Sequence, residues 1–242
     1  MFKKAMIASA VLAGAFAAQA QVGTPAPSAT LTVGGTVTAP ICSLALAGGG
    51  AATFGTITRP LTGWTTISTA PARYQAPASK KQTVALNVSC PAPTKMALAM
   101  QDNRSASVVA PASAVANFGL GTYTPAGGGT ATNIGNFFVD YTGLQITPTV
   151  GGTAAAPAVK LVTAGTATSS STWAAATGVL ASYLPTSQSL GFAATAGATT
   201  PDSLASIAGN LVVNVELSKA TVDAATSDIT LDGNATITLV GL

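Results

Sequence analysis

Residues 82–101, QTVALNVSCPAPTKMALAMQ, hold two runs in which apolar and polar residues alternate, separated by a segment with two prolines. The large apolar side chains stand at every second position of each run: Val84, Leu86, Val88, Met96, Leu98 and Met100. Because successive side chains of a β-strand point to opposite faces, this spacing predicts two strands that each bury one face. The stretch therefore indicates a β-protein.

Similar short runs recur along the chain, with Gly, Pro, Asn and Asp between them. They are residues 33–41, 53–57, 136–146, 211–218, 228–233 and 234–240. No amphipathic helix of ten or more residues is expected after the N-terminal segment, and the Ala-rich stretch 173–184 is compatible with one or two helical turns. About eight short runs of period two with turn residues between them predict an all-β sandwich.

The first twenty residues have the pattern of a secretory signal peptide. Lys3 and Lys4 precede an apolar stretch at 5–18, and residues 18–20, Ala-Gln-Ala, form a cleavage signal with small residues at both key positions. The apolar stretch is short for a membrane span, which needs about 18 residues or more. We expect residues 1–20 to be removed, leaving an extension at 21–39 and a single domain at 40–242.

Charged residues make up only 7% of the chain, against about a quarter in typical soluble domains. Removing the two lysines of the signal peptide lowers the formal net charge from +3 to about +1. Nucleic acid is therefore not an expected partner, because its phosphates are bound by basic patches. Low charge also gives little protection against self-association, which suits a protein that assembles.

Two cysteines, Cys42 and Cys90, follow the signal peptide. An isolated pair in an exported protein predicts one disulfide. The sequence contains no histidine, so no Ser-His-Asp or Cys-His arrangement can be assembled. A zinc site is a poor alternative to the disulfide, because two lone cysteines cannot complete a tetrahedral zinc shell. No metal and no cofactor are expected.

The acidic residues are few and scattered: Asp102, Asp140, Asp202, Glu216, Asp223, Asp228 and Asp232. An enzyme is not expected, because general acids and bases are scarce. A secreted hydrolase that uses two facing carboxylates remains an alternative, since sequence spacing does not decide which acids face each other. The triplet 102–104, Asp-Asn-Arg, is interpreted as a turn stabilised by a side chain, with a small polar site as the alternative.

Two further features bear on a binding role. The scattered aromatic residues Trp64, Tyr74, Tyr123 and Trp173 are interpreted as packing residues, with a sugar-binding platform as the alternative. Residues 149–200 contain one charge, Lys160, and are rich in Ala, Thr, Gly and Ser. We expect an ordered insertion there and not a flexible linker, because large apolar residues recur toward its end.

The stretch ATLTVGGTVTAPICSL, residues 29–44, alternates Thr with apolar residues and has two glycines at its centre. An apolar strand needs a second surface on which to bury its face, and a glycine in mid-strand fits where a partner backbone comes close. Two alternatives follow: the strand joins the chain's own sheet, or it fills a groove on another molecule.

Taken together, this stretch, the FGTI run at 54–57, the second cysteine after VALNVS and the C-terminal run GNATITLVGL resemble the subunits of chaperone–usher fimbriae (pili) of Gram-negative bacteria. More narrowly, SCPAPTKMALAMQDNRSAS (89–107) and FGLGTYTPAGGGTATNIGNFFVDYTG (118–143) resemble a family of secreted fimbrial-subunit-like proteins whose function is largely unassigned.

The resemblance implies an immunoglobulin-like, pilin-type sandwich that lacks its last strand. A periplasmic chaperone first fills the open groove, and the N-terminal extension of the next subunit then replaces it at the outer-membrane usher. The donor residues would be Leu31, Val33, Gly35, Val37 and Ala39, and the C-terminal assembly strand would carry Ala235, Ile237 and Leu239. Gly241 departs from the family, which often has tyrosine next to last.

The implied function is that of a structural subunit of a surface fimbrium with a role in adhesion. Its partners would be neighbouring subunits, the chaperone and the usher, and its location the cell surface, reached through the periplasm. The alternative is a self-complemented secreted β-sandwich that binds a surface or carbohydrate partner.

Overall fold

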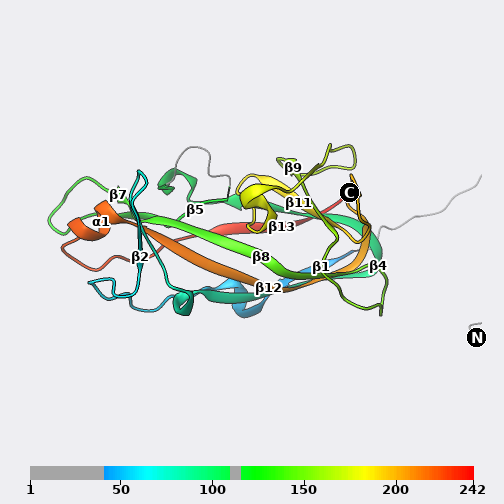
Figure 1. Ribbon diagram of the computed structural model, residues 1–242, viewed down its shortest axis with the longest axis horizontal. Helices are drawn as coiled ribbons and strands as arrows, with labels where there is room; N and C mark the ends of the chain where they lie inside the picture. The colour runs from blue at the N-terminus through cyan, green and yellow to red at the C-terminus, as the bar shows by residue number, and fades with distance from the viewer. Residues whose placement is uncertain (1–40, 110–115) are drawn as a thin grey trace, which may run out of the picture. The chain divides into compact units, whose positions relative to one another are not determined.

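The computed structural model describes residues 41–109 and 116–242, which form a β-protein (Figure 1). The strands are β1 (Ser43–Leu46), β2 (Thr65–Ile67), β3 (Arg73–Gln75), β4 (Gln82–Asp102), β5 (Phe118–Gly119), β6 (Thr122–Tyr123), β7 (Thr132–Asn133), β8 (Gly135–Thr147), β9 (Val159–Ala164), β10 (Ala174–Ala175), β11 (Gln188–Ala193), β12 (Ser203–Ser218) and β13 (Ala235–Gly241). The helical elements are α1 (Lys219–Ala224) and the 3-10 turns η1 (Ala47–Gly50), η2 (Ala78–Lys80), η3 (Ser105–Ser107) and η4 (Gly178–Ala181). The predicted all-β class is confirmed. Within the described ranges, no helix is both long enough and apolar enough to cross a bilayer.

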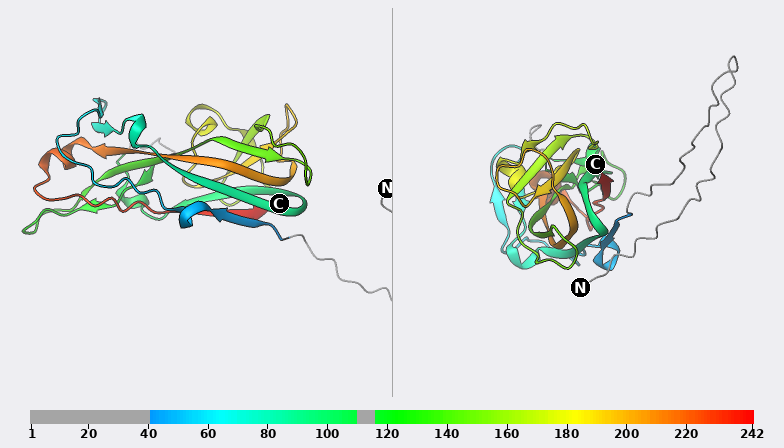
Figure 2. Two further views of the ribbon diagram at one scale, coloured as in Figure 1. Left: turned by 90° about the horizontal axis from the view of Figure 1, so that it is seen from below. Right: turned by 90° about the vertical axis from the view of Figure 1, so that its right-hand side faces the viewer.

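Strand β4 organises the sheet because it pairs along both of its halves. Residues 82–89 lie between β1 and β12, and residues 96–102 pair with β13 along one edge and with β11 along the other. The ladder with β12 is irregular around residues 90–93, and there the chain turns back on itself (Figure 2). All these pairings are antiparallel. The two predicted runs of 82–101 are thus one long strand whose halves belong to different parts of a folded sheet.

The hydrophobic core lies inside this fold, and both halves of β4 contribute to it. Leu86 and Val88 from the first half and Met96 and Leu98 from the second belong to one buried cluster. Polar positions between them, such as Asn87, are exposed. The period-two pattern therefore predicted the buried face of β4 correctly.

Two predicted strands are wrong, at 53–57 and at 228–233. Neither segment pairs with a strand among the described residues. Gly55 has φ +61°, in the left-handed region, and this breaks the extended run. The apolar residues of both segments, Phe54 and Leu231 among them, still pack against the core, which explains their alternation.

Residues 149–200, which the sequence predicts to be an ordered insertion, contain three short strands and the turn η4. The strands β9, β10 and β11 extend the sheet from the second half of β4, in the order β10–β9–β11–β4. Leu190 and Phe192 of β11 are fully buried. The Ala-rich stretch 173–184 forms β10 and the single turn η4 in place of a longer helix.

The predicted disulfide between Cys42 and Cys90 is confirmed. It joins the residue before β1 to the end of the first half of β4, across a sequence separation of 48 residues. Since β1 is only four residues long, this bond supplies much of its attachment.

Candidate functional site

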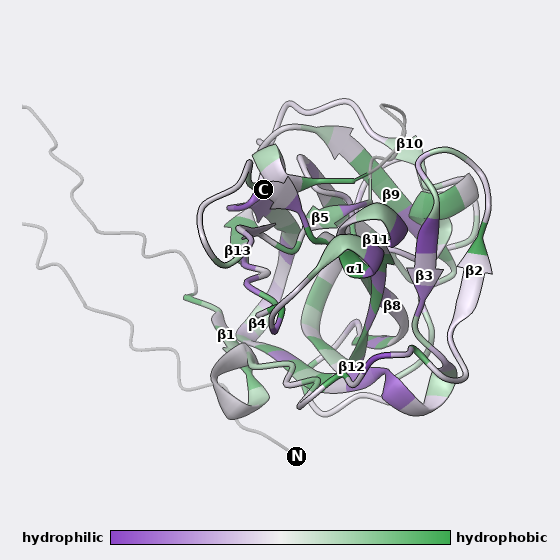
Figure 3. Cartoon of the chain, turned by 90° about the vertical axis from the view of Figure 1, so that its left-hand side faces the viewer, coloured by the Kyte–Doolittle hydropathy of each residue, from purple (hydrophilic) through white to green (hydrophobic). Residues whose placement is uncertain are grey.

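An apolar groove is lined by the end of β1 and the start of β13. Figure 3 shows these two strands on the same side of the domain. Its volume is about 390 Å³. One wall consists of the end of β1 and the segment up to residue 54, and the other wall consists of residues 231–237. Core side chains of β4, β8 and β12 form the floor: Val84, Phe137, Val139, Leu211 and Val213. The groove therefore leads directly onto the hydrophobic core.

Each wall of the groove contains an edge strand. Among the residues that the structure describes, β1 pairs only with residues 86–89 of β4, and β13 pairs only with residues 96–102. The second edge of each strand carries backbone N–H and C=O groups that no ladder uses. Each of these edges is therefore open to pairing with a further strand.

The side chains along the walls are apolar and only partly buried. They are Leu44, Leu46 and Phe54 on one wall and Leu231, Ile237 and Leu239 on the other or beside it. Each square ångström of apolar surface left in water costs about 25 cal/mol relative to burial. A continuous apolar surface between two open strand edges is typical of a site that another segment covers.

The C-terminal residues expected to serve in assembly lie on this wall. Ala235 and Ile237 line the groove. Leu239 packs against the core further along β13, and Gly241 ends the strand opposite Met96. Their role in assembly stays a prediction.

The expected donor residues, Leu31, Val33, Gly35, Val37 and Ala39, lie outside the described residues. Ile41, the described residue just before Cys42, is 87% exposed. Cys42 is bonded to Cys90, so the point at which an extension would leave the domain is held covalently at the end of the first half of β4.

The chain between α1 and β13 belongs to no strand and is held by polar contacts. The Arg59 guanidinium donates to three backbone carbonyls between residues 222 and 227. The Tyr123 hydroxyl accepts hydrogen bonds from the backbone N–H groups of Thr226, at 3.1 Å, and of Ser227, at 3.3 Å. These contacts fix the segment that leads into the second wall.

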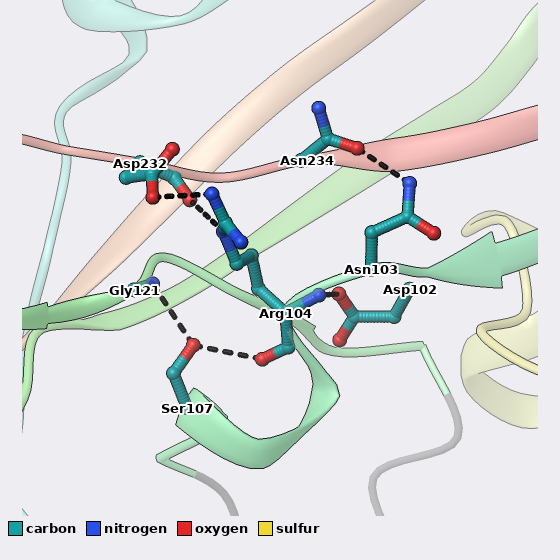
Figure 4. A network of polar contacts seen from close by, with 7 residues as sticks. All are labelled: Asp102, Asn103, Arg104, Ser107, Gly121, Asp232 and Asn234. Atoms are coloured by element: carbon teal, nitrogen blue, oxygen red, sulfur yellow. Dashed lines mark hydrogen bonds and ion pairs between the residues drawn. The ribbon is translucent and has the colours of Figure 1, made fainter.

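A second set of contacts holds the start of β13 (Figure 4). Arg104 forms an ion pair with Asp232 at 2.6 Å. The backbone N–H of Asn103 donates to the carbonyl oxygen of Asn234 at 3.0 Å, and Asn234 lines the groove. Because both charged side chains are well exposed, we assign the ion pair at most about 1 kcal/mol and regard it as a positioning contact.

The triplet Asp102-Asn103-Arg104 is a turn, as interpreted from the sequence. The Asp102 carboxylate accepts from the backbone N–H of Arg104 at 2.8 Å and from that of Gly119 at 2.9 Å. Ser107 donates to the carbonyl oxygen of Arg104 and accepts from the N–H of Gly121 (Figure 4). The carboxylate is thus engaged in holding the loop together.

Other acidic side chains also have local partners. Asp140 accepts from Thr142, Asp202 accepts from the backbone at residues 194 and 195, and Asp223 accepts from Lys219. No group of three or more His, Cys, Asp or Glu residues that could hold a metal occurs in the described part of the chain. The expectation that the protein is not an enzyme stays a prediction.

Tyr123 provides a test of the contacts that hold the second wall. Hydrogen bonds from Ser227 and Thr226 lower its pKa to about 8, from an ordinary 10. The pKa of Tyr141 shifts the other way, because burial raises it above the ordinary value. We expect a tyrosinate absorbance titration to show one group ionising near pH 8 and the Tyr123→Phe variant to lack it; persistence of that step in the variant would contradict the assignment.

The same shift sets the sign of a pH effect on stability. The pKa of Tyr123 is lower in the folded than in the unfolded state, so folding favours the phenolate. Its contribution to stability is complete above the unfolded pKa of about 10 and is lost as the pH falls through about 8. Between these values the unfolding free energy of the wild type should rise with pH relative to that of Tyr123→Phe.

Sequence reasoning missed most of the groove. The floor residues Phe137, Val139 and Leu211 are apolar residues of predicted strands, and in the sequence they look like any other buried strand position. No sequence pattern distinguishes a core position covered by the chain itself from one at the base of a groove. Thr53 and Phe54 of the first wall belong to the run 53–57, which the sequence predicted as a strand and not as a groove wall.

A model of a protein family of unknown function, DUF1120, matches residues 31–137, which is less than half of the chain. No curated protein and no solved structure matches the sequence.

Proposed function

We propose that this chain is a structural subunit of a surface fimbrium (pilus) that assembles by donor-strand exchange. The observation that carries the proposal is the apolar groove between the open edges of β1 and β13, with the hydrophobic core as its floor. The strand orders also support the proposal. One part of the folded sheet has the order β1–β4–β12–β8, and the other has the order β13–β4–β11. We expect these orders for an immunoglobulin-like sandwich without its last strand.

The extension at 21–39 has the composition that such a groove requires. Leu31, Val33 and Val37 alternate with threonine, so one face of an extended strand is apolar. Burying a Leu or Val side chain contributes roughly 1.5–3 kcal/mol. Backbone hydrogen bonds to both wall strands would add affinity without depending on sequence, as in other cases of strand addition.

The geometry at Cys42 favours the groove of a second copy. β1 starts at Ser43 and is itself part of a wall, so the chain runs along the groove after Cys42. To enter its own groove, the extension would have to reverse direction within the two or three residues before Cys42. Donation to a neighbouring subunit requires no such reversal.

Export and assembly complete the proposal. The signal peptide at 1–20 would direct the chain to the periplasm, where a chaperone would shield the groove until an outer-membrane usher passes the subunit to the growing fimbrium. The partners are thus neighbouring subunits, chaperone and usher, and the location is the cell surface, with a role in adhesion.

A truncation combined with a peptide tests this function. The chain lacking residues 21–39 should fold with a chaperone, stay monomeric in analytical ultracentrifugation and bind a peptide of residues 29–40. At a peptide concentration of about 100 Kd, binding should add about 2.7 kcal/mol to the unfolding free energy and raise Tm by about 5–10 °C.

Two neighbouring positions of β13 provide a matched control in the truncated chain. Ile237 lines the groove, whereas Thr238 is exposed on the other face of the strand. Ile237→Asp should abolish the stabilisation by the peptide and Thr238→Asp should preserve it. A bulky residue in place of Gly35 of the peptide should also abolish it.

Several outcomes would contradict donor-strand exchange. One such outcome is that the chain lacking residues 21–39 still forms oligomers. Another is that the peptide leaves the Tm of the truncated chain unchanged. A full chain that stays monomeric at every concentration, with a truncated chain that cannot fold even beside the chaperone, would establish self-complementation.

A further inference from the structure

A second cavity, of about 300 Å³, lies on the opposite face of the sheet from the groove. Sites for small molecules start at about this size. The alternation of β8 and β12 separates the two: Phe137 and Val213 belong to the floor of the groove, whereas their neighbours Phe138 and Asn214 line the second cavity. The cavity is therefore independent of the groove and of the function proposed for it.

The insertion forms one side of this cavity. The N–H of Tyr141 donates to the carbonyl oxygen of Ser182 at 2.9 Å, and that of Leu184 donates to Val139 at 2.8 Å. These bonds hold the intervening Tyr183 next to β8. Its ring meets that of Phe138 at a centroid distance of 5.9 Å and an angle of 56°, so two aromatic rings line the cavity.

Three polar side chains that line the cavity are more than nine-tenths buried, with exposed fractions of 8% for Asn117, 7% for Asn214 and 6% for Glu216. Among the described residues, the side-chain amides of Asn117 and Gln75 have no hydrogen-bond partner. Asn214 uses its oxygen to accept from the N–H of Val215 and keeps its NH₂ group available. Among the described residues, Gln188 Oε1 is the one fully buried side-chain polar atom without a partner, so the unpaired amide groups of this cavity keep some contact with solvent and are open to a ligand that enters it.

The charge of the cavity is balanced internally. Glu216 Oε2 lies 2.7 Å from Nε of Arg73, while no partner of its second oxygen occurs in the described chain. An anion would meet the Glu216 carboxylate, and a cation would have to compete with the guanidinium. The site therefore favours a ligand that is polar and uncharged.

We infer that this cavity binds a neutral saccharide unit. A side-chain amide donates and accepts from the same plane, which matches the adjacent hydroxyl groups of a sugar, and the free carboxylate oxygen accepts one more hydroxyl. The rings of Phe138 and Tyr183 offer an apolar surface to the C–H face of a pyranose. The insertion thus adds a sugar-binding site to a domain whose other face carries the groove.

Saturation-transfer NMR on the secreted full chain tests the inference. The probes are the methyl glycosides of glucose, galactose, mannose and N-acetylglucosamine, and choline serves as a cationic probe. We expect saturation transfer to at least one glycoside and none to choline. Asn117→Ala and Tyr183→Ala should each weaken that binding by about tenfold or more, because one loses a hydrogen bond and the other an aromatic wall.

Asn87→Ala is the matched control, since Asn87 is exposed on β4 and does not line the cavity. It should leave the affinity unchanged. Circular dichroism establishes that each variant folds, and Gln75→Ala replaces any variant that does not. The inference is overturned if no glycoside shows transfer, if choline binds in their place, or if the cavity variants bind as well as the control.

Discussion

Replacing both cysteines, Cys42→Ala/Cys90→Ala, is expected to lower the unfolding free energy by about 4 kcal/mol. The disulfide spans 48 residues, and closing a loop of this length in the unfolded chain accounts for about 4 kcal/mol in the chain-entropy description. The loss should appear in urea unfolding under oxidising conditions. It would be among the largest effects of any change in this chain, because single substitutions usually cost about 0.5–3 kcal/mol.

Loss of the disulfide should also weaken binding in the groove. β1 has four residues and pairs only with β4 within the described chain, so a released N-terminal end would fray and remove part of one wall. The truncated chain without the disulfide should then bind the 29–40 peptide more weakly. Dithiothreitol should reproduce both effects in the wild type and change nothing further in the double variant. Equal stability with and without the bond would contradict the expectation.

Glu216→Ala is expected to cost about 3–5 kcal/mol, because it leaves the Arg73 guanidinium buried without a counter-charge. The side chains of this pair are only 11% and 8% exposed, and Nε lies 2.7 Å from Oε2. Arg73 is in the three-residue strand β3, which pairs with the end of β12 through residues 73–75. Loss of the pair should therefore loosen β3 as well as lower global stability, as measured by urea unfolding.

The exposed pair Arg104–Asp232 supplies the control. Its side chains are 44% and 60% exposed, so Asp232→Ala should cost less than about 1 kcal/mol. Replacing both buried partners, Arg73→Met/Glu216→Leu, should restore most of the stability that Glu216→Ala loses, since no charge is left uncompensated. Similar losses at the two pairs, or a double variant as unstable as Glu216→Ala, would argue against a desolvated pair.

The strands that sequence reasoning located correctly are those with an uninterrupted alternation. In 82–90, 95–101 and 234–240, side chains of period two can bury one face only in an extended chain, so the pattern predicts the conformation directly. The same reasoning was wrong at 53–57 and 228–233, where apolar residues also alternate. Gly55 breaks the first segment, and the second is tied to Leu120 by the N–H of Asp232 in place of a ladder. Both segments bury apolar side chains without pairing, and spacing alone does not separate these cases.

The second cavity was missed for a related reason. Asn214 and Glu216 stand at alternate positions of a predicted strand, a pattern that is typical of a solvated face. They are buried because the η4 segment of the insertion and the chain around Asn117 cover that face of β8 and β12. The aromatic residues involved, Phe138 and Tyr183, were not among those considered for sugar binding.

Local spacing in the sequence was enough to establish the β-class, the buried face of β4, the single disulfide and the turn at 102–104. Each depends on residues close in the chain or, for the disulfide, on the absence of any other cysteine. The open edges of β1 and β13, and the cavity on the opposite face, became known only from the folded chain. Which strands share β4, and which faces are left uncovered, depends on contacts between segments far apart in sequence, and period-two patterns carry no information about those contacts.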